Sequence, residues 1–341
     1  MSGRTVIGSI ARGGDFALRP PEALPRPRGE WRTGDYVIAE MMDTGTGRFE
    51  VEPPGGGIQE IEPGDRLIGA LGIRAATLTL VGDWHGVGED LELETLTQAG
   101  VLGRCTSTAV PPPPIARLRY LGHAARSGRP LTMGDCVRRV PERSLEAPVI
   151  LIIGTSMDAG KTVAAVAIIR TLKAMGLRVA GAKLTGVGRF RDILAMSDAG
   201  ADGILDFVDA GLPSTVVPEA DYERALATMC SMLAATEPDV VVAEAGASPL
   251  EPYNGELAVR GLGERVCTTV LCASDPYAVV GVIEAFGRRP DLVSGRATST
   301  SAGIELIDKL VGIDAINMFD PDVETKLRAF LVGRVPAASA T

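Results

Sequence analysis

The second part of the chain alternates apolar runs with amphipathic stretches. The segment APVILIIG (147–154) is continuously apolar, as expected of a strand that is buried on both faces. Runs of this kind predict strands at 148–153, 177–183, 239–244, 266–273 and 314–318. Helical periodicity predicts helices at 160–175, 221–236, 276–286, 301–311 and 321–331. The alternation predicts an α/β domain over 148–335, in which helices cover both faces of a parallel sheet.

The first part of the chain has short apolar stretches separated by turn residues. GDYVIAEMM (34–42) and GDRLIGALG (64–72) each begin with Gly-Asp and continue as an apolar stretch, which is typical of strands. AATLTLVGDW (75–84) predicts a further strand. One helix is predicted over Glu89–Ala99, where Leu91, Leu93 and Leu96 supply the apolar positions. We therefore expect a small β-rich domain over 33–115, either a barrel or a sandwich.

Two segments beside this region lack periodicity. Residues 1–32 are rich in Arg, Pro and Gly, which favours a tail or an arm laid over the surface. The prolines of Val110–Ile115 favour stiff, extended geometry. Together with the weakly patterned residues 116–147, they predict a linker between the two domains.

Composition excludes several classes of protein. The 43 acidic residues outnumber the 34 basic ones, and aromatic residues make up 4%, so we expect no nucleic-acid partner. Five cysteines without a CxxC pair and two histidines make a disulfide framework or a zinc site improbable. No apolar run reaches the roughly 18 residues of a membrane span, and the first residues do not resemble a signal peptide. We therefore expect a cytoplasmic protein without a membrane partner.

The strongest chemical signal is a glycine-containing loop between a buried strand and an alanine-rich helix. Its glycines let backbone amides approach phosphate oxygens, and the helix N-terminus adds the positive end of a dipole. The predicted nucleotide-binding residues are Gly154, Thr155, Ser156, Met157, Asp158, Ala159, Gly160, Lys161, Thr162 and Val163. Lys161 is expected to reach the β- and γ-phosphates, and the Thr162 hydroxyl to hold Mg²⁺.

The loop has five residues between its two glycines, where the common P-loop pattern has four. GTSMDAGKT (154–162) resembles in this spacing the loop of dethiobiotin synthetase and its relatives, and the resemblance extends over roughly Val149–Asp275. MinD-type ATPases carry a second lysine in this loop, but no lysine stands at Thr155 or Ser156. No Asn-Lys-x-Asp motif, which reads guanine, occurs either. ATP is therefore favoured over GTP.

A second lysine stands at a predicted strand end. The chain uses 29 arginines and only five lysines, and Lys183 directly follows the apolar strand 177–182. Ligands of open parallel sheets bind beyond the carboxyl ends of the strands, where a compact ammonium suits a small anion. AKLTG (182–186) resembles a Lys-Pro-x-x-x-Gly segment of dethiobiotin synthetase without its proline, which implies contact of Lys183 with substrate and phosphate. The alternative is a surface lysine.

Carboxylates supply candidate metal ligands. The strand 239–244 ends in Glu244, which could hold Mg²⁺ opposite Thr162. Ser197–Ala199 resembles a Ser-Asp-Ala segment of the same family, which implies Asp198 as a second ligand, although a helix cap is an equal alternative. Asp192 and Asp202 compete for that role.

A second resemblance concerns the P-loop proteins that include D-glutamate N-acetyltransferase. It is carried by KLTG (183–186), ADGILDFVDAG (201–211) and EAGASPLEPYNGE (244–256). It adds four candidate substrate contacts, which are Thr185, Gly186, Tyr253 and Asn254. The last two could equally form a turn, because Asn-Gly is a strong turn signal. Ser274–Asp275 and the polar loop 294–303 could also line a nucleotide.

Three functions fit these features. The first is a Mg²⁺- and ATP-dependent enzyme of ligase type, in which Lys161, Lys183 and Glu244 act on a small carboxylate or an amino-acid-like substrate by phosphoryl transfer. The second is an N-acyltransferase with acetyl-CoA as the donor at the loop. The third is a non-catalytic nucleotide-binding regulator. A metal site formed by Thr162 and Glu244 favours the first. We expect a small-molecule substrate and a homodimer or higher homo-oligomer.

Overall fold

The computed structural model describes residues 3–45, 48–246 and 248–337. They form two compact units. The first contains residues 1–139 with the short segments 187–191 and 207–216, and the second contains 140–186, 192–206 and 217–341. Two segments that lie within the predicted α/β domain in sequence therefore fold with the N-terminal unit.

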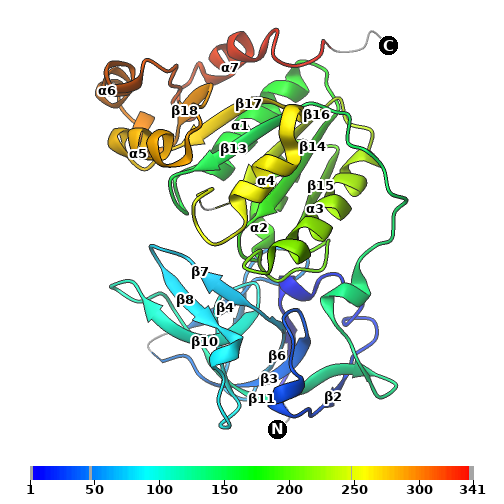
Figure 1. Ribbon diagram of the computed structural model, residues 1–341. Coiled ribbons are helices and arrows are strands. Elements are labelled where there is room, and N and C mark those ends of the chain that lie inside the picture. The colour runs from blue at the N-terminus through cyan, green and yellow to red at the C-terminus, as the bar shows by residue number, and fades with distance from the viewer. Residues whose placement is uncertain (1–2, 46–47, 247, 338–341) are drawn as a thin grey trace. The chain divides into compact units, whose positions relative to one another are not determined.

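The first unit is built around a closed ring of five strands, shown in blue to green in Figure 1. These strands are β3 (Tyr36–Asp43), β6 (Arg66–Leu71), β9 (Glu92–Thr95), β10 (Val101–Thr108) and β11 (Arg117–Arg126). Their order is β6–β3–β11–β9–β10, and β10 pairs again with β6. Among the five pairs of this ring, only β6–β10 is parallel. The expected β-rich domain is thus a barrel.

Short elements complete this unit. They are β1 (Thr5–Ile7), β2 (Glu22–Leu24), β4 (Phe49–Val51), β5 (Gln59–Ile61), β7 (Ile73–Ala75), β8 (Leu80–Asp83) and β12 (Arg129–Pro130), with 3-10 turns at Ser9–Ala11, Arg28–Glu30, Trp84–Gly86 and Met133–Cys136. Strand β1 pairs with β6, and β2 pairs with β11.

Three expectations for this region differ from the structure. Residues 1–32 are no tail, because two strands and the fully buried Ile10 come from them. The helix predicted over Glu89–Ala99 is the strand β9 with turns on either side, because Leu93 faces the barrel core and Glu92 and Glu94 alternate with it. The predicted linker 116–147 contains β11, which pairs with both β3 and β9.

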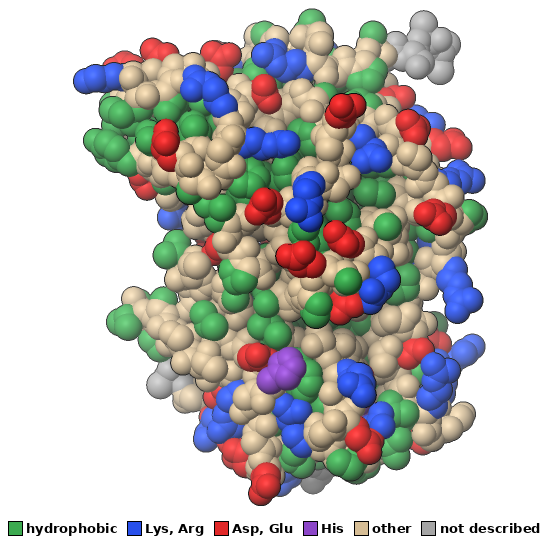
Figure 2. Space-filling model, in the orientation of Figure 1, with side chains coloured by type: hydrophobic (Ala, Val, Ile, Leu, Met, Phe, Trp, Pro, Cys, Tyr) green, Lys and Arg blue, Asp and Glu red, His purple; other side chains and the backbone are tan. Residues whose placement is uncertain are grey.

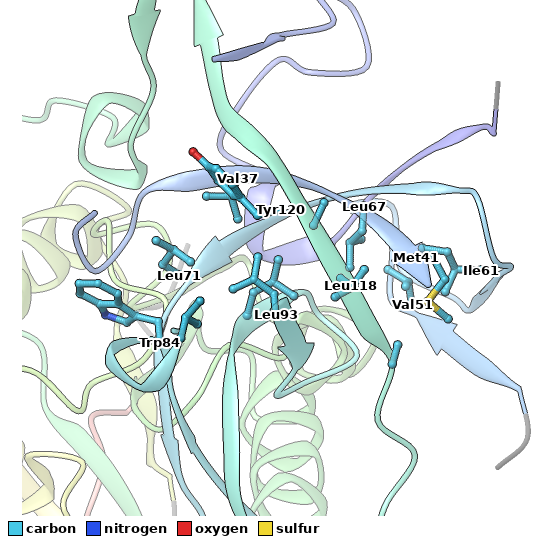
Figure 3. Packing of buried hydrophobic residues seen from close by; sticks show 14 of the residues in the cluster. Val37, Met41, Val51, Ile61, Leu67, Leu71, Trp84, Leu93, Leu118 and Tyr120 are labelled. Carbon is cyan, nitrogen blue, oxygen red and sulfur yellow. The ribbon is translucent and has the colours of Figure 1, made fainter. Parts of the chain in front are cut away.

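The barrel core explains why these short strands hold together. Figure 3 shows Val37, Leu67, Leu93 and Leu118 within the barrel, with Trp84 toward one end. All four aliphatic side chains are fully buried, and Trp84 is 5% exposed. Burial of each such side chain contributes about 1.5–3 kcal/mol, which offsets the entropy lost on ordering the turns.

The second unit is an α/β domain with a six-stranded parallel sheet. Its strands are β13 (Val149–Gly154), β14 (Val179–Thr185), β15 (Gly203–Asp206), β16 (Val240–Ala245), β17 (Val266–Cys272) and β18 (Leu292–Ser294). They lie in the order β15–β14–β16–β13–β17–β18. The four central strands of the sheet are mostly apolar and buried, as the sequence predicted; they are β14, β16, β13 and β17.

Helices cover both faces of this sheet. They are α1 (Lys161–Ala174), α2 (Phe190–Asp198), α3 (Glu219–Ala234), α4 (Gly255–Leu262), α5 (Pro276–Phe286), α6 (Ser301–Val311) and α7 (Val323–Leu331), with 3-10 turns at Gly263–Arg265 and Arg296–Thr298. Helix α1 packs with α7 on one face, and α3 packs with α4 on the other (Figure 1). The strand predicted at 314–318 is reduced to one bridge between Ala315 and Val293. The sequence did not indicate α2, α4, β15 or β18.

The surface carries mixed charge. Figure 2 shows acidic and basic side chains interspersed on the face in view, which is the pattern of an ordinary solvated surface. Among the described residues, no helix combines the length and the apolarity needed to cross a bilayer.

Candidate functional site

The predicted phosphate-binding loop joins strand β13 to helix α1. The strand ends at Gly154, the helix begins at Lys161, and the Thr155 amide donates to the Cys272 carbonyl at the end of β17 (3.0 Å). Two residues adopt left-handed backbone angles, Asp158 with φ +56° and Gly160 with φ +103°. Glycine adopts this region freely, and Asp is among the few other residues that visit it. Strand, loop and helix thus have the P-loop arrangement.

Two neighbouring loops hold this loop in place. The Ser274 amide donates to Thr155 Oγ1 (3.0 Å), just before Asp275 caps helix α5. Gly295 has φ +88°, and a Cβ placed on it would lie 2.2 Å from the Ala159 carbonyl oxygen. Only glycine permits this approach, so the loop after β18 directly supports the loop after β13. Both loops were candidates to line a nucleotide, and the structure places them against the P-loop.

Lys161 is 5% exposed and donates to the Ser156 carbonyl oxygen through Nζ (2.6 Å). Burial lowers the pKa of this ammonium below its ordinary value, although the Glu244 carboxylate acts in the opposite direction. An anion bound in the loop would supply the compensating charge. Asp158 in the middle of the loop and Val163 in the first turn of α1 are exposed, unlike Lys161.

Thr162 and Glu244, the two candidate ligands for Mg²⁺, are in contact. The Thr162 hydroxyl donates to Glu244 Oε2 across 3.2 Å, and Glu244 is 3% exposed at the end of strand β16. Burial raises the pKa of Glu244, as does Asp192, whereas Lys183 and Lys161 oppose the shift. A hydroxyl oxygen beside a carboxylate is the kind of donor pair that Mg²⁺ takes in proteins.

Lys183 is buried, so it is not the solvated surface lysine of the alternative interpretation. Its Nζ donates to Asp192 Oδ2 across 2.6 Å, and its side chain is 8% exposed. Burial on its own lowers the pKa of this ammonium, but the charges of Asp192 and Glu244 outweigh burial and raise it. The neighbouring carboxylates thus favour the charged form of this buried lysine.

The sheet register explains why these charges gather. Lys183 on β14 lies opposite Asp206 on β15 and opposite Glu244 on β16. Residues opposite one another on adjacent strands share a face of the sheet, so the three side chains form one row. Asp206 is fully buried and is a functional candidate that sequence reasoning missed. Its place at the end of β15 could have indicated it, had that strand been predicted.

The three candidates for a second carboxylate ligand lie in different places. Asp198 is exposed in the last turn of helix α2, whereas Asp192 stands in the first turn of the same helix. Asp202 accepts from Lys173 Nζ (2.6 Å) and from the Val179 amide (2.7 Å), which makes it a structural residue. Of the three competitors, the structure brings Asp192 alone into contact with Lys183.

The four candidate substrate residues divide into two pairs. Thr185 is fully buried and its hydroxyl donates to the Gly246 carbonyl (3.1 Å), while Gly186 has φ +130° beside the Lys183 side chain. Tyr253 is fully buried, and Asn254, with φ +59°, donates to the Val217 carbonyl (2.9 Å) before helix α4. The second pair forms the turn that was the alternative interpretation.

Comparisons with known proteins return structures at low similarity. No family profile and no curated protein matches the sequence. Chloroplast FtsY from Physcomitrella patens is 13% identical over 59% of this chain and 69% of its own, with a TM-score of 0.37. Hydrogenase maturation factor HypB from Archaeoglobus fulgidus is 15% identical over 55% and 89%, with a TM-score of 0.37. A ParA family ATPase from Chlorobium tepidum is 14% identical over 56% and 93%, with a TM-score of 0.32.

Proposed function

We propose that this chain is a Mg²⁺- and ATP-dependent enzyme that activates a small carboxylate or amino-acid-like substrate by phosphoryl transfer. The observation that carries the proposal is the buried charge cluster beside the loop. It contains Lys161, the Thr162–Glu244 pair and the Lys183–Asp192 pair, and the charges of Glu244 and Lys183 act on the pKa of Lys161. A loop that only holds a nucleotide has no need of a second buried ammonium.

The residues present fit Mg²⁺ and a nucleoside triphosphate. The Lys161 ammonium is buried with its pKa lowered, so a phosphate anion would restore its favoured charge. Thr162 Oγ1 and Glu244 Oε2 would hold the cation. When bound, Mg²⁺ and ATP supply a transferable phosphoryl group and part of the charge that stabilises its transfer. The amides of residues 155–160 and the start of α1 would bind the phosphates.

In this proposal, the Lys183 ammonium would donate hydrogen bonds to the substrate or to the transferred group. One proton of its ammonium is used on Asp192, and an ammonium has three to donate. The remaining donors suit an anionic oxygen, either of the substrate carboxylate or of the transferred group. Because Asp192 and Glu244 raise the pKa of Lys183, it would act as a positive charge and not as a base.

The two alternative functions would give different experimental results. An N-acyltransferase with acetyl-CoA at the loop would need neither Mg²⁺ nor hydrolysis, and the Thr162–Glu244 pair disfavours it. A non-catalytic regulator would bind nucleotide without turnover. The expected ATP preference over GTP and the expected homo-oligomer stay predictions.

Release of ADP tests the proposal. The purified protein is incubated with Mg²⁺ and ATP and with a panel of small carboxylates and amino acids, alone and with ammonia as an amine acceptor. We expect at least one substrate to stimulate ADP release, and Lys161→Ala to abolish the stimulation. Transfer of an acetyl group from acetyl-CoA without ATP would instead establish the acyltransferase, and nucleotide binding with no stimulated turnover would favour the regulator.

A further inference from the structure

The barrel unit contains a cavity of about 510 Å³ whose residues are all different from those of the candidate site. Its wall is formed by residues around the 3-10 turn Arg28–Glu30, by residues just before β3, and by the segment from β12 to the turn Met133–Cys136. All of these residues belong to the barrel unit. The volume falls within the range of roughly 300–1,000 Å³ that small-molecule sites occupy.

Charged side chains dominate the wall of this cavity, and most of them neutralise one another. Arg26 Nε donates to Glu30 Oε2 (3.0 Å), and the Arg129 guanidinium donates to Asp135 Oδ1 (2.7 Å). The other oxygen of Asp135 accepts from the Thr132 amide and the Thr132 hydroxyl, both at 2.9 Å. These four charges therefore form two internal pairs and leave one further cation and one further anion in the wall, which are Arg32 and Asp35.

Arg32 and Asp35 each keep a group available for a ligand. Arg32 is exposed, and within the described part of the chain no hydrogen bond or ion pair of its guanidinium is identified. Asp35 is 6% exposed, and both hydrogen bonds identified for its carboxylate end on Oδ2. They come from the Arg32 amide (2.8 Å) and from His123 Nε2 (3.0 Å). Oδ1 is therefore left for a donor from outside the chain.

A chain of buried polar groups holds the Asp35 carboxylate at the cavity wall. His123 is fully buried, and its Nδ1 lies 2.5 Å from the Tyr120 hydroxyl oxygen, which accepts from the Arg26 amide (3.1 Å). Figure 3 shows this hydroxyl turned away from the labelled aliphatic side chains of the core. Since the amide donates to Tyr120, the tyrosine proton is available for His123 Nδ1, and the hydrogen on Nε2 points to Asp35.

The spacing of the two available charges suits a compact ligand. The Asp35 amide donates to the Arg32 carbonyl (3.1 Å), so the two residues belong to one turn. An α-amino acid carries an ammonium and a carboxylate on the same carbon. A carboxylate binds an ammonium through charge-assisted hydrogen bonds, and a guanidinium binds a carboxylate with two parallel ones. A lone anion would meet the carboxylates of the wall, and a lone cation would meet its arginines.

We propose that this cavity binds a free amino acid, with its ammonium on Asp35 and its carboxylate on Arg32. His123 and Tyr120 are positioning residues, because they fix the direction of the Asp35 carboxylate. The balanced charges of the wall favour a ligand that carries both signs. The proposal does not rest on the proposed function, because every residue that it uses lies in the barrel unit.

Calorimetric titration of the full chain with each proteinogenic amino acid, without nucleotide, tests the proposal. The amino acid that binds most tightly is then compared with its N-acetyl derivative, which lacks the ammonium, and with its amide, which lacks the carboxylate. We expect each derivative to bind about 10-fold more weakly or worse, the scale of one charged hydrogen bond. Absence of binding by every amino acid, or equal affinity of the N-acetyl derivative, would overturn the proposal.

Variants of the barrel unit locate the bound amino acid. Arg32→Gln should weaken binding by about 10-fold or more. Arg66→Gln should leave it unchanged, because Arg66 is likewise exposed in this unit but lies outside the cavity. Asp35→Asn should weaken it as well, with Asp65→Asn as the buried control. Should Asp35→Asn not fold, Arg32→Gln tests the proposal alone, because an exposed side chain without an identified partner can be replaced safely.

A variant of the α/β unit separates this proposal from the proposed function. Lys183→Ala should leave amino-acid affinity unchanged, since Lys183 lies in the other unit. Loss of binding in Lys183→Ala with full binding in Arg32→Gln would overturn the cavity and place the amino acid at the proposed active site. Retained amino-acid binding in a protein that binds no ATP would refute the proposed function and leave the cavity established.

Discussion

Lys183 and the partly buried Asp192 form an ion pair in which Nζ and Oδ2 are 2.6 Å apart. The lysine lies near the carboxyl end of strand β14, and the aspartate lies in the first turn of helix α2. Burying two charges is costly unless they are paired, and breaking such a pair leaves one of them uncompensated. This pair therefore fixes a positive charge beside the P-loop.

Replacing Lys183 should remove this charge and turnover with it. We expect Lys183→Ala to lower stimulated ADP release by about 100-fold or more, the scale of losing one preorganised charge contact. Lys183→Arg should rescue poorly, because the lysine Cε passes within 3.4 Å of the positions that a Cβ would take on Gly186 and Gly246. A guanidinium is larger and planar. ATP affinity should fall less than in Lys161→Ala. Recovery of full turnover by Lys183→Arg would contradict this account.

Glu244→Gln separates nucleotide binding from Mg²⁺-dependent chemistry. The amide keeps an oxygen for the Thr162 hydroxyl but loses the negative charge that would hold the cation. We expect nucleotide affinity within a few-fold of wild type and Mg²⁺-dependent turnover lower by about 100-fold. Asp198→Asn is the comparison, because Asp198 is exposed and should leave turnover unchanged. The opposite result would return the metal role to Asp198.

The sequence predicted the parts of the site that depend on local pattern. A buried strand, a glycine-containing loop and a helix follow one another in the chain, so their order could be predicted, as could the place of Glu244 near a strand end, while their binding of nucleotide stays a prediction. The roles of Asp192 and Asp206 could not be predicted, because they depend on sheet register and on two short elements, α2 and β15. These elements have too few apolar positions to show a period. A motif resemblance favoured Asp198, yet helix geometry places Asp192 at Lys183.

The barrel unit shows the same limit. Leu91, Leu93 and Leu96 fit a helical pattern, but β9 closes a ring between β10 and β11, and this pairing determines its conformation. Burial in a barrel overrides local preference. Likewise, nothing local shows that residues 9–12 contact Phe190 and Asp209, which lie almost two hundred residues further along.

Gly295 lies in the loop after β18, and Gly295→Ala should distort the neighbouring loop 154–162. The new Cβ would lie 2.2 Å from the Ala159 carbonyl, at a backbone conformation open only to glycine. We expect a loss of about 1–3 kcal/mol in stability, together with weaker nucleotide binding. Gly281→Ala is the matched control, because its Cβ meets no atom within 4 Å and it lies inside helix α5. That change should stabilise the protein by about 0.5–1 kcal/mol. Equal melting temperatures for the two variants would refute the packing argument.

Asp65 should make part of the stability depend on pH. Burial raises the pKa of Asp65, but the hydrogen bond from Arg4 and the amide of Glu62 outweigh burial and lower it below the ordinary value. A lowered folded-state pKa stabilises the protein above the unfolded pKa of about 3.9, and this contribution is lost as pH falls through the folded-state value. Asp65→Asn should therefore be less stable than wild type at pH 7, and the difference should shrink below about pH 4. Denaturant unfolding at both pH values measures it, and a constant difference would contradict the assignment.

Calorimetric titration of Mg²⁺ and ATP into the wild type, Lys161→Ala and Lys173→Ala tests the central claim most directly. Lys161 Nζ lies within the loop, whereas Lys173 pairs with Asp202 on the surface, so the two variants remove the same side chain from different places. We predict Mg²⁺-dependent binding of ATP to the wild type and to Lys173→Ala, with affinity about 10- to 150-fold weaker in Lys161→Ala, the range for a charged hydrogen bond. Equal affinity in all three proteins, or binding of acetyl-CoA where ATP does not bind, would contradict the account.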